Sequence, residues 1–336
     1  MPGAAARFPR ICGKAIPVRV MLAAPVSSSD RVDLRVQVGA LRLANPILAA
    51  SGTFGYGLEF AHLVDLEKLG GIVTKGLSLE PIEGAPAPRL LNTPSGMLNA
   101  VGLQNVGVKA FIDEKLPLLG KYKTPVIVNV FGYCLEDYVE VIRRLEDAPG
   151  IAAYELNISC PNVKQGGMQF GSNPALVAEV VGAARVAAKR PLWVKLMPLV
   201  TDIAAIGRAA EGAGADALVV ANTYPAMAID FRTGQSRLGN LTGGLSGPAI
   251  KPITLRLVWE TRKAVKIPVI GLGGVETAED ALEYVAMGAA AVQVGTASFT
   301  DPTVSQRLVE GLESALFRAK TFTISEIRGK FSADFG

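Results

Sequence analysis

The sequence predicts an α/β fold of the (β/α)8, or TIM barrel, class. Eight short segments rich in Val, Ile, Leu and Ala alternate with longer amphipathic segments along most of the chain. The short segments are apolar on both faces, as strands of a parallel sheet are when helices cover it. Glycine-rich turns follow the seventh and the eighth, where barrels commonly hold phosphate. These features favour a barrel over a doubly wound sheet, and a chain of 336 residues suits one such domain.

The elements follow one another in a regular order. The segment 32–46 alternates around Gly39 and predicts a β-hairpin that caps the bottom of the barrel. The expected strands are 46–52, 71–76, 125–132, 152–159, 191–198, 215–223, 268–274 and 290–296. Helices are expected where apolar residues recur three or four positions apart, at 135–148, 174–189, 201–214 and 277–289. The last of these opens on Thr277, a favourable N-cap, and has acidic residues in its first turn.

Residues 30–336 are expected to form a single domain, because no interdomain linker is apparent. We interpret residues 1–29 as a disordered extension, or as the result of a start assigned upstream of Met21. Arg19 interrupts what would be the apolar core of a signal peptide. The net charge of +4 belongs to this extension, since the other 30 basic residues balance 30 acidic ones. The barrel therefore gives no electrostatic argument for binding nucleic acid or an anionic membrane.

Few residues are available for disulfides or metal sites. The three cysteines, Cys12, Cys134 and Cys160, show no paired spacing, which argues against a disulfide framework and suits a reducing cytoplasm. They are also too few for an all-cysteine iron–sulfur cluster. The single histidine, His62, excludes His-rich metal sites and disfavours a Ser–His–Asp triad. No metal site is expected, and no apolar run of about 18 residues predicts a membrane span.

Two lysines fall near the carboxyl ends of predicted strands, which is the functional face of a barrel. Lys195, in "WVKLMP", lies within an apolar strand, where a buried ammonium requires a negative partner. No acidic residue accompanies it on that strand, so we expect the anion to come from a ligand. The alternative is a lysine that extends to the barrel rim. Lys75 repeats the pattern at the end of the second strand.

Two glycine-rich turns follow the last two strands. "GLGGVE" (271–276) and "VGTASF" (294–299) can direct backbone N–H groups at a phosphate, with help from the helix N-termini that follow. Neither is a Rossmann fingerprint. Each alone could be a tight turn, but together at these positions they predict a phosphate site.

Asparagines gather at the strand ends and in the adjoining loops. An amide both donates and accepts hydrogen bonds, so a cluster of amides suits a planar heterocycle that displays carbonyl and N–H groups. Any one of them could instead serve ordinary turn geometry. The group comprises Asn99, Asn105, Asn157, Asn162 and Asn222.

Cys160 stands in "NISCPNVKQGG", between a strand and a glycine pair that would allow the loop to move as a lid. A thiol at that face is a candidate nucleophile or general base. Because no histidine or carboxylate lies near it in the sequence, we favour proton abstraction beside a redox cofactor. Cys134 is expected to be a small buried apolar residue, as free cysteines usually are.

From about residue 32 to its end, the chain resembles the catalytic subunits of class 1B dihydroorotate dehydrogenases, which are FMN-dependent enzymes of pyrimidine (UMP) biosynthesis. The motifs occur in the family's order. They are "VTKG", "NAVGLQN", "NISCPNVKQGGMQFG", "ANTYPAMAID", "GGLSGPAIKP", "GLGGV" and "VGTA".

The resemblance implies oxidation of (S)-dihydroorotate to orotate, an oxidoreductase reaction on a CH–CH group. Cys160 would be the catalytic base that removes the C5 proton while a hydride passes from C6 to flavin N5. The implied substrate-binding residues are Lys75, Asn99, Ala100, Val101, Gly102, Leu103, Asn157, Asn222 and Thr223. The implied FMN-binding residues are Ser51, Lys75, Gly76, Asn129, Asn157, Lys195, Ala221, Gly247, Gly273, Gly274, Gly295 and Thr296.

The resemblance also implies a homodimer whose electrons pass to NAD+ through a partner subunit that holds FAD and a 2Fe–2S cluster, in a heterotetramer. The absence of a dinucleotide fingerprint and of cluster ligands in this chain is consistent with that division. The principal alternative is the class 1A type, which uses fumarate without a partner. Class 2 enzymes carry serine where this chain has Cys160. A tRNA-dihydrouridine synthase would need a basic RNA-binding domain after the barrel, and a barrel that only binds phosphate would need neither Cys160 nor Lys195.

Overall fold

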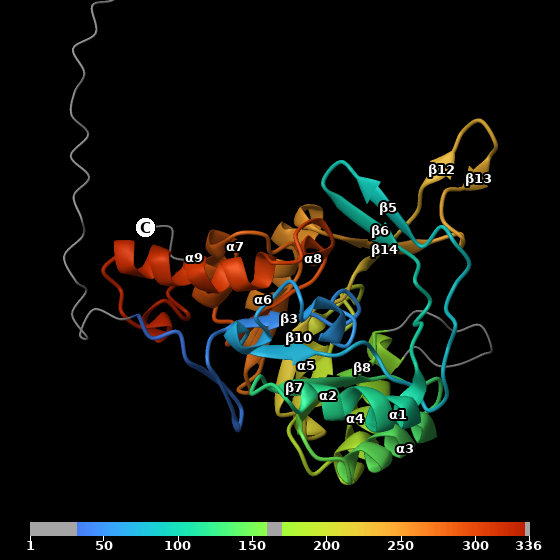
Figure 1. The fold of residues 1–336 in the computed structure, drawn as a ribbon, viewed down its shortest axis with the longest axis horizontal. Coiled ribbons are helices and arrows are strands. Elements are labelled where there is room, and N and C mark those ends of the chain that lie inside the picture. Colours follow the sequence, from blue (N-terminus) through green and yellow to red (C-terminus); the bar gives the residue numbers. More distant parts are fainter. Residues whose placement is uncertain (1–31, 160–169, 333–336) are drawn as a thin grey trace, which may run out of the picture. The chain divides into compact units, whose positions relative to one another are not determined.

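Eight parallel strands close into a barrel in the computed structural model, which describes residues 32–159 and 170–332 (Figure 1). The hydrogen-bonded order around the barrel is β10-β15-β16-β3-β4-β7-β8-β9, and β9 pairs with β10 to complete the ring. The strands are β3 (Ile47–Ala49), β4 (Gly71–Val73), β7 (Val126–Val130), β8 (Ile151–Asn157), β9 (Leu192–Lys195), β10 (Ala217–Val220), β15 (Val269–Leu272) and β16 (Ala291–Val294). Each lies within a predicted strand or begins one residue before it, so the barrel class is confirmed and the doubly wound alternative is wrong.

Helices lie between the strands and bury their apolar sides against the barrel. In α3, for example, Tyr138, Val141, Ile142 and Leu145 are buried, at the helical spacing seen in the sequence. The four predicted helices are confirmed as α3 (Leu135–Glu146), α4 (Pro174–Ala187), α5 (Ile203–Gly212) and α7 (Ala278–Ala286). Further helices are α1 (Gly107–Ala110), a π-helical turn (Phe111–Lys115), α2 (Leu116–Leu119), α6 (Lys251–Ala264), α8 (Ala297–Thr300) and α9 (Val304–Arg318).

The predicted hairpin caps the amino-terminal end of the barrel. Its strands β1 (Val36–Val38) and β2 (Leu41–Leu43) pair antiparallel around Gly39, whose φ of 58° suits a residue without Cβ. Val38 and Leu43 are buried in one cluster with barrel residues such as Trp193. This packing closes the bottom of the barrel interior with apolar side chains.

A second, four-stranded antiparallel sheet was not predicted from the sequence. Its order is β11 (Tyr224–Ala226), β14 (Gly243–Ser246), β6 (Gly96–Asn99) and β5 (Leu90–Thr93). These strands belong to the connections that follow β4 and β10, so they come from the carboxyl-terminal face of the barrel (Figure 1). The hairpin of β12 (Ile229–Asp230) and β13 (Gln235–Ser236) extends from the same connection. The sheet has its own small apolar cluster, which includes Leu98 and Leu238.

The prediction for residues 1–29 lies outside the described residues. In the part of the chain that the structure describes, no helix is both long enough and apolar enough to cross a membrane.

Candidate active site

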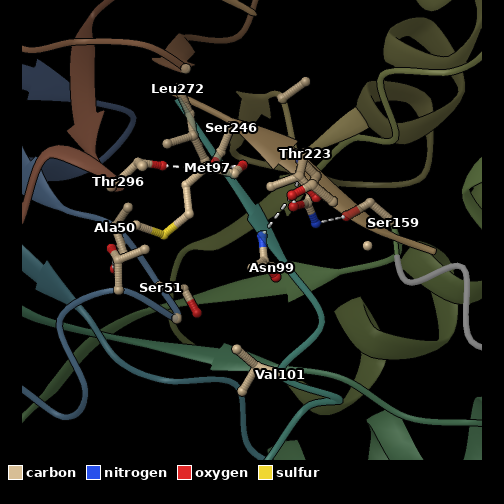
Figure 2. Close-up of a pocket in the computed structure, with 18 of the residues that line it drawn as sticks. Ala50, Ser51, Met97, Asn99, Val101, Ser159, Thr223, Ser246, Leu272 and Thr296 are labelled. Carbon is tan, nitrogen blue, oxygen red and sulfur yellow. Dashed lines mark hydrogen bonds between the residues drawn. The ribbon is translucent and has the colours of Figure 1, made fainter. Parts of the chain in front are cut away.

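A cavity of about 320 Å³ lies at the carboxyl ends of the barrel strands, between the barrel and the second sheet (Figure 2). All of the predicted substrate-binding and cofactor-binding residues line it. They are Ser51, Lys75, Gly76, Asn99, Ala100, Val101, Gly102, Leu103, Asn129, Asn157, Lys195, Ala221, Asn222, Thr223, Gly247, Gly273, Gly274, Gly295 and Thr296. Residues up to 245 positions apart in the sequence therefore meet at one site.

The predicted base, Cys160, lies outside the described residues, as do Asn162 and the glycine pair of the expected lid. Ser159, the last described residue before Cys160, lines the cavity.

Lys195 has an acidic partner within the protein. Its Nζ lies 3.7 Å from Oε1 of Glu155, and the two side chains are only 6% and 0% exposed. Glu155 lies on β8, the strand next to Lys195, so the prediction of a lysine without a protein carboxylate is wrong. The burial of Lys195 also contradicts the alternative of a side chain that extends to the rim. The Lys195 ammonium therefore contacts this carboxylate, and the residue also lines the cavity.

Glu155 is held by two further side chains. Asn129 Nδ2 donates to its Oε1 at 2.7 Å, and Gln293 Nε2 donates to its Oε2. Asn129 Oδ1 and Gln293 Oε1 are buried and accept no hydrogen bond from the described residues. Because a buried acceptor normally has a partner, the free oxygen of Asn129, a cavity-lining residue, indicates a donor supplied by a ligand.

Three polar side chains that line the cavity form a chain of hydrogen bonds around Ser159, which Figure 2 labels. Ser159 Oγ donates to Oδ1 of Asn157 at 2.7 Å and accepts from Nδ2 of Asn222 at 2.5 Å. Asn222 Oδ1 in turn accepts from the backbone N–H of Thr223 at 2.8 Å. These bonds fix the orientation of both amides before any ligand binds.

Asn99 approaches from the opposite element, the second sheet. Met97, Asn99 and Val101 follow one another along β6 and beyond, across the cavity (Figure 2). Asn99 Nδ2 donates to the carbonyl oxygen of Gly244 on β14 at 3.1 Å. A Cβ at Gly244 would lie 2.1 Å from Oγ1 of Thr223, so glycine at this position leaves room for the threonine.

Lys75 follows β4 and is partly buried in the cavity wall. Its backbone N–H donates to Gly55 O at 2.8 Å. Burial lowers the pKa of its ammonium, and the nearby Glu59 opposes this shift less strongly. An anionic group of a ligand would add to the negative charge of Glu59 in stabilising this ammonium.

The two glycine turns adopt conformations that favour glycine. Gly273 and Gly274 have φ values of 151° and 67°. The phenol of Tyr284, on α7, donates to the carbonyl oxygen of Gly273 at 2.7 Å and so braces the turn from behind. Thr296 Oγ1, after β16, donates to Oγ of Ser246 at 2.7 Å (Figure 2). Residues of both turns line the cavity, and glycine turns of this kind can present backbone N–H groups to an anion.

Two further expectations from the sequence are wrong. Cys134 is exposed rather than buried, because it is the N-cap residue of α3, at the surface. Asn105 does not line the cavity. Its side chain bonds to Ser78, to the carbonyl oxygen of Leu103 and to the N–H of Gly107, so at this position turn geometry explains the asparagine.

Among the residues at or behind the cavity that were not predicted are Glu155, Ser159, Gly244 and Ser246. Gly244 and Ser246 fall within the motif "GGLSGPAIKP", so the sequence carried a signal for both. Among the described residues, no group of three or more His, Cys, Asp or Glu side chains is arranged to bind a metal ion.

The fold is that of a barrel enzyme, with its site at the carboxyl ends of the strands. The lysines, amides and glycine turns around one cavity suit an anionic, polar ligand. The comparisons with known proteins are more specific. The family model for dihydroorotate dehydrogenase matches residues 33–316. The chain therefore belongs to the dihydroorotate dehydrogenase family.

Individual relatives agree with this assignment. The chain is 55% identical to a dihydroorotate dehydrogenase B (NAD+) catalytic subunit of Trichlorobacter lovleyi, over 88% of this chain and 97% of the relative. It is 54% identical to the corresponding subunit of Pelobacter propionicus, over 88% and 98%. A protein of Solibacter usitatus described as a putative dihydroorotate dehydrogenase A (fumarate) is 57% identical over 85% and 94%. The family indicated by the motifs is thereby confirmed.

Proposed function

We propose that this chain is the catalytic subunit of an NAD+-linked dihydroorotate dehydrogenase, which oxidises (S)-dihydroorotate to orotate for pyrimidine synthesis. The observation that carries the proposal is the meeting of Lys75, Lys195, the oriented amides and both glycine turns on one cavity. The cysteine content of the chain suits a reducing cytoplasm as the place of this reaction.

The residues of the cavity fit FMN. The Gly273–Gly274 and Gly295–Thr296 turns would hold the phosphate, as glycine turns after the last two barrel strands commonly do. The unpartnered Oδ1 of Asn129 suits a ring N–H, and the Lys195 ammonium suits the polar edge of the ring on which negative charge develops. Ser51, Gly76, Ala221 and Gly247 would complete the pocket wall around the cofactor.

The remaining polar residues fit the substrate. The Lys75 ammonium would bind the carboxylate of dihydroorotate, and the amides of Asn99, Asn157 and Asn222 would bind its ring carbonyl and N–H groups. Because Ser159 and Gly244 already orient these amides, little side-chain freedom would be lost on binding. The segment from Ala100 to Leu103 and the hydroxyl of Thr223 would close the site from the second sheet.

The reaction removes a proton from C5 and a hydride from C6 of dihydroorotate, which leaves the C5–C6 double bond of orotate. FMN, when bound, supplies the hydride acceptor. We assign the proton to the thiolate of Cys160, since Ser159 brings the chain to the cavity wall immediately before it. Lys75 and the amides would hold the ring so that the proton and the hydride leave from fixed positions.

The electron acceptor distinguishes two types within the family. The names of two of the relatives described above include NAD+ and one includes fumarate. We propose NAD+, reached through a partner subunit with FAD and a 2Fe–2S cluster, and a homodimeric catalytic core. The term "catalytic subunit" in the relatives' names supports the existence of such a partner.

The test is the acceptor preference of the purified chain. We expect it to carry FMN and to reduce an artificial dye with dihydroorotate, but to reduce NAD+ only when co-expressed with an electron-transfer subunit. Rapid fumarate reduction by the chain alone would instead establish the fumarate-dependent type. A chain without flavin, or one inactive toward dihydroorotate with every acceptor, would overturn the proposal.

A further inference from the structure

Glu155 is a buried acid that the proposed reaction does not use. It lies in the middle of the barrel on β8 with its side chain 0% exposed, and it does not line the cavity. Lys195 from β9, Asn129 from β7 and Gln293 from β16 all converge on its two carboxylate oxygens. The Glu155 carboxylate thus links Lys195 and Asn129, which line the cavity, to Gln293 on another strand of the barrel.

Stability does not account for this arrangement. Removing two charges from water costs several kcal/mol per ion, and apolar residues of similar volume often serve a protein core equally well. Ligand binding does not explain it either, because a lysine without Glu155 could also bind an anionic ligand. The presence of the carboxylate behind the lysine therefore calls for an electrostatic explanation. The barrel interior screens charge poorly. The negative charge of Glu155 therefore acts on any ligand group that Lys195 and Asn129 contact in the cavity.

We propose that Glu155 is a positioning residue that holds Lys195 and Asn129 against the flavin and lowers the flavin's reduction potential. The inference rests on the proposed function. Two-electron reduction with uptake of one proton adds one negative charge to the flavin ring. The Lys195 ammonium favours that charge and the Glu155 carboxylate opposes it, so their balance sets the potential. A lowered potential suits transfer to NAD+, which is a much weaker oxidant than fumarate.

The substitution Glu155→Gln removes the charge while it keeps the shape of the side chain. The new amide oxygen can keep the bonds from Asn129 and Lys195. Its N–H group would then face Gln293, whose buried Oε1 accepts no hydrogen bond from the described residues and can accept this one once the Gln293 amide turns over. We expect the midpoint potential of the bound flavin, measured by spectroelectrochemistry with FMN in excess, to become more positive. The expected change is at least tenfold in the equilibrium between oxidised and reduced flavin, or about 30 mV for a two-electron couple. Glu155→Asp, which retains the charge, should remain near the wild-type potential.

Glu146→Gln is the matched control. Glu146 also forms an ion pair, with Arg190 at 3.1 Å, and its side chain is 10% exposed, but it does not line the cavity. Its substitution should leave the potential unchanged. A second comparison sets the single variant Lys195→Gln against the double variant Lys195→Gln/Glu155→Gln. The double variant lacks the negative charge that the single variant keeps, so its flavin should have the more positive potential. This comparison keeps the test available if Glu155→Gln alone does not fold.

A potential that is unchanged or more negative in Glu155→Gln would overturn the inference. So would an equal shift in Glu155→Asp, since the effect would then follow from packing and not from charge. These outcomes leave the proposed function intact, because wild-type protein would still bind FMN and oxidise dihydroorotate. A wild-type chain that bound no FMN would instead refute the proposed function itself.

Discussion

Lys75 illustrates how the environment of one residue sets the chemistry of the site. Burial lowers the pKa of its ammonium, so the side chain loses its proton at a lower pH than an exposed lysine does. The protonated form, which predominates below that pKa, is the form that binds a carboxylate.

We therefore expect KM for dihydroorotate to rise as the pH rises through the lowered pKa of Lys75. In Lys75→Met this alkaline increase should disappear, and KM should be about 10- to 100-fold higher at neutral pH, since a hydrogen bond to a charged group contributes about 1.5–3 kcal/mol. Steady-state kinetics at about pH 7 and above provide the measurement. An alkaline increase that persists unchanged in Lys75→Met would assign the titration to another group.

Cys160 permits a second test at this scale. Cys160→Ser should bind FMN as the wild type does but should reduce it with dihydroorotate about 10²- to 10⁴-fold more slowly, because a hydroxyl is a much poorer base than a thiolate. Rapid mixing under anaerobic conditions measures this rate directly. Cys134→Ser, at an exposed helix N-cap, is the control and should react normally. Loss of FMN with unchanged chemistry in the remaining holoenzyme would contradict the role of base.

Sequence reasoning found the site residues that stand at strand ends, because the barrel brings all such ends to one face. Lys195 and the glycine turns are examples. It missed Glu155, whose contact with Lys195 crosses from β8 to β9 and depends on strand register. It also placed Cys134 in the core, since the sequence of a helix N-terminus does not by itself show which side of the helix faces solvent.

At the scale of elements, α7 supports the turn after β15. Tyr284 reaches from the helix to the carbonyl oxygen of Gly273, and Gly271 leaves space for its ring, because a Cβ there would lie 2.3 Å from Cδ1 of Tyr284. The turn that we propose for the phosphate is thus fixed by a helix and not by the loop alone.

Tyr284→Phe should raise the dissociation constant for FMN about 2- to 10-fold, as expected for the loss of one hydrogen bond of about 0.5–1.5 kcal/mol. Fluorescence titration of the apoprotein with FMN gives this constant. Tyr154→Phe is the matched control, because its buried phenol accepts from Arg190 and does not line the cavity. Equal FMN affinity in Tyr284→Phe and wild type would show that the brace is not needed.

The second sheet is the other element that shapes the site. Its strands are short and only partly buried, and β14 begins with two glycines, so local sequence preferences gave little indication of it. The pairing of β6 with β14 joins segments about 145 residues apart, as in the bond from Asn99 to Gly244. Such a pairing follows from the tertiary fold.

Gly244→Ala should disturb substrate binding more than cofactor binding, since its Cβ would collide with Oγ1 of Thr223. We expect KM for dihydroorotate to increase at least several-fold, while FMN affinity changes little. Gly182→Ala in α4 is the control, because a Cβ at Gly182 would meet no atom within 4 Å and alanine favours the helix. An unchanged KM in Gly244→Ala would show that the second sheet accommodates the added methyl group without disturbing the substrate site.

At the scale of the whole barrel, closure explains why distant motifs act together. Eight strands in a ring place the turns after β3, β4, β7, β8, β9, β10, β15 and β16 around one opening. The alternation of strands and helices, which the sequence displays directly, therefore sufficed to predict both the architecture and the face of the site. The buried pair of Glu155 and Lys195 adds an electrostatic element that only the assembled barrel reveals.

We propose above that this cavity holds a flavin which dihydroorotate reduces. Anaerobic titration of the purified holoprotein with dihydroorotate, followed by the visible absorbance of the flavin, tests it most directly. We expect dihydroorotate to bleach the flavin spectrum and an added electron acceptor to restore the oxidised spectrum. A flavin spectrum that dihydroorotate leaves unchanged would contradict it.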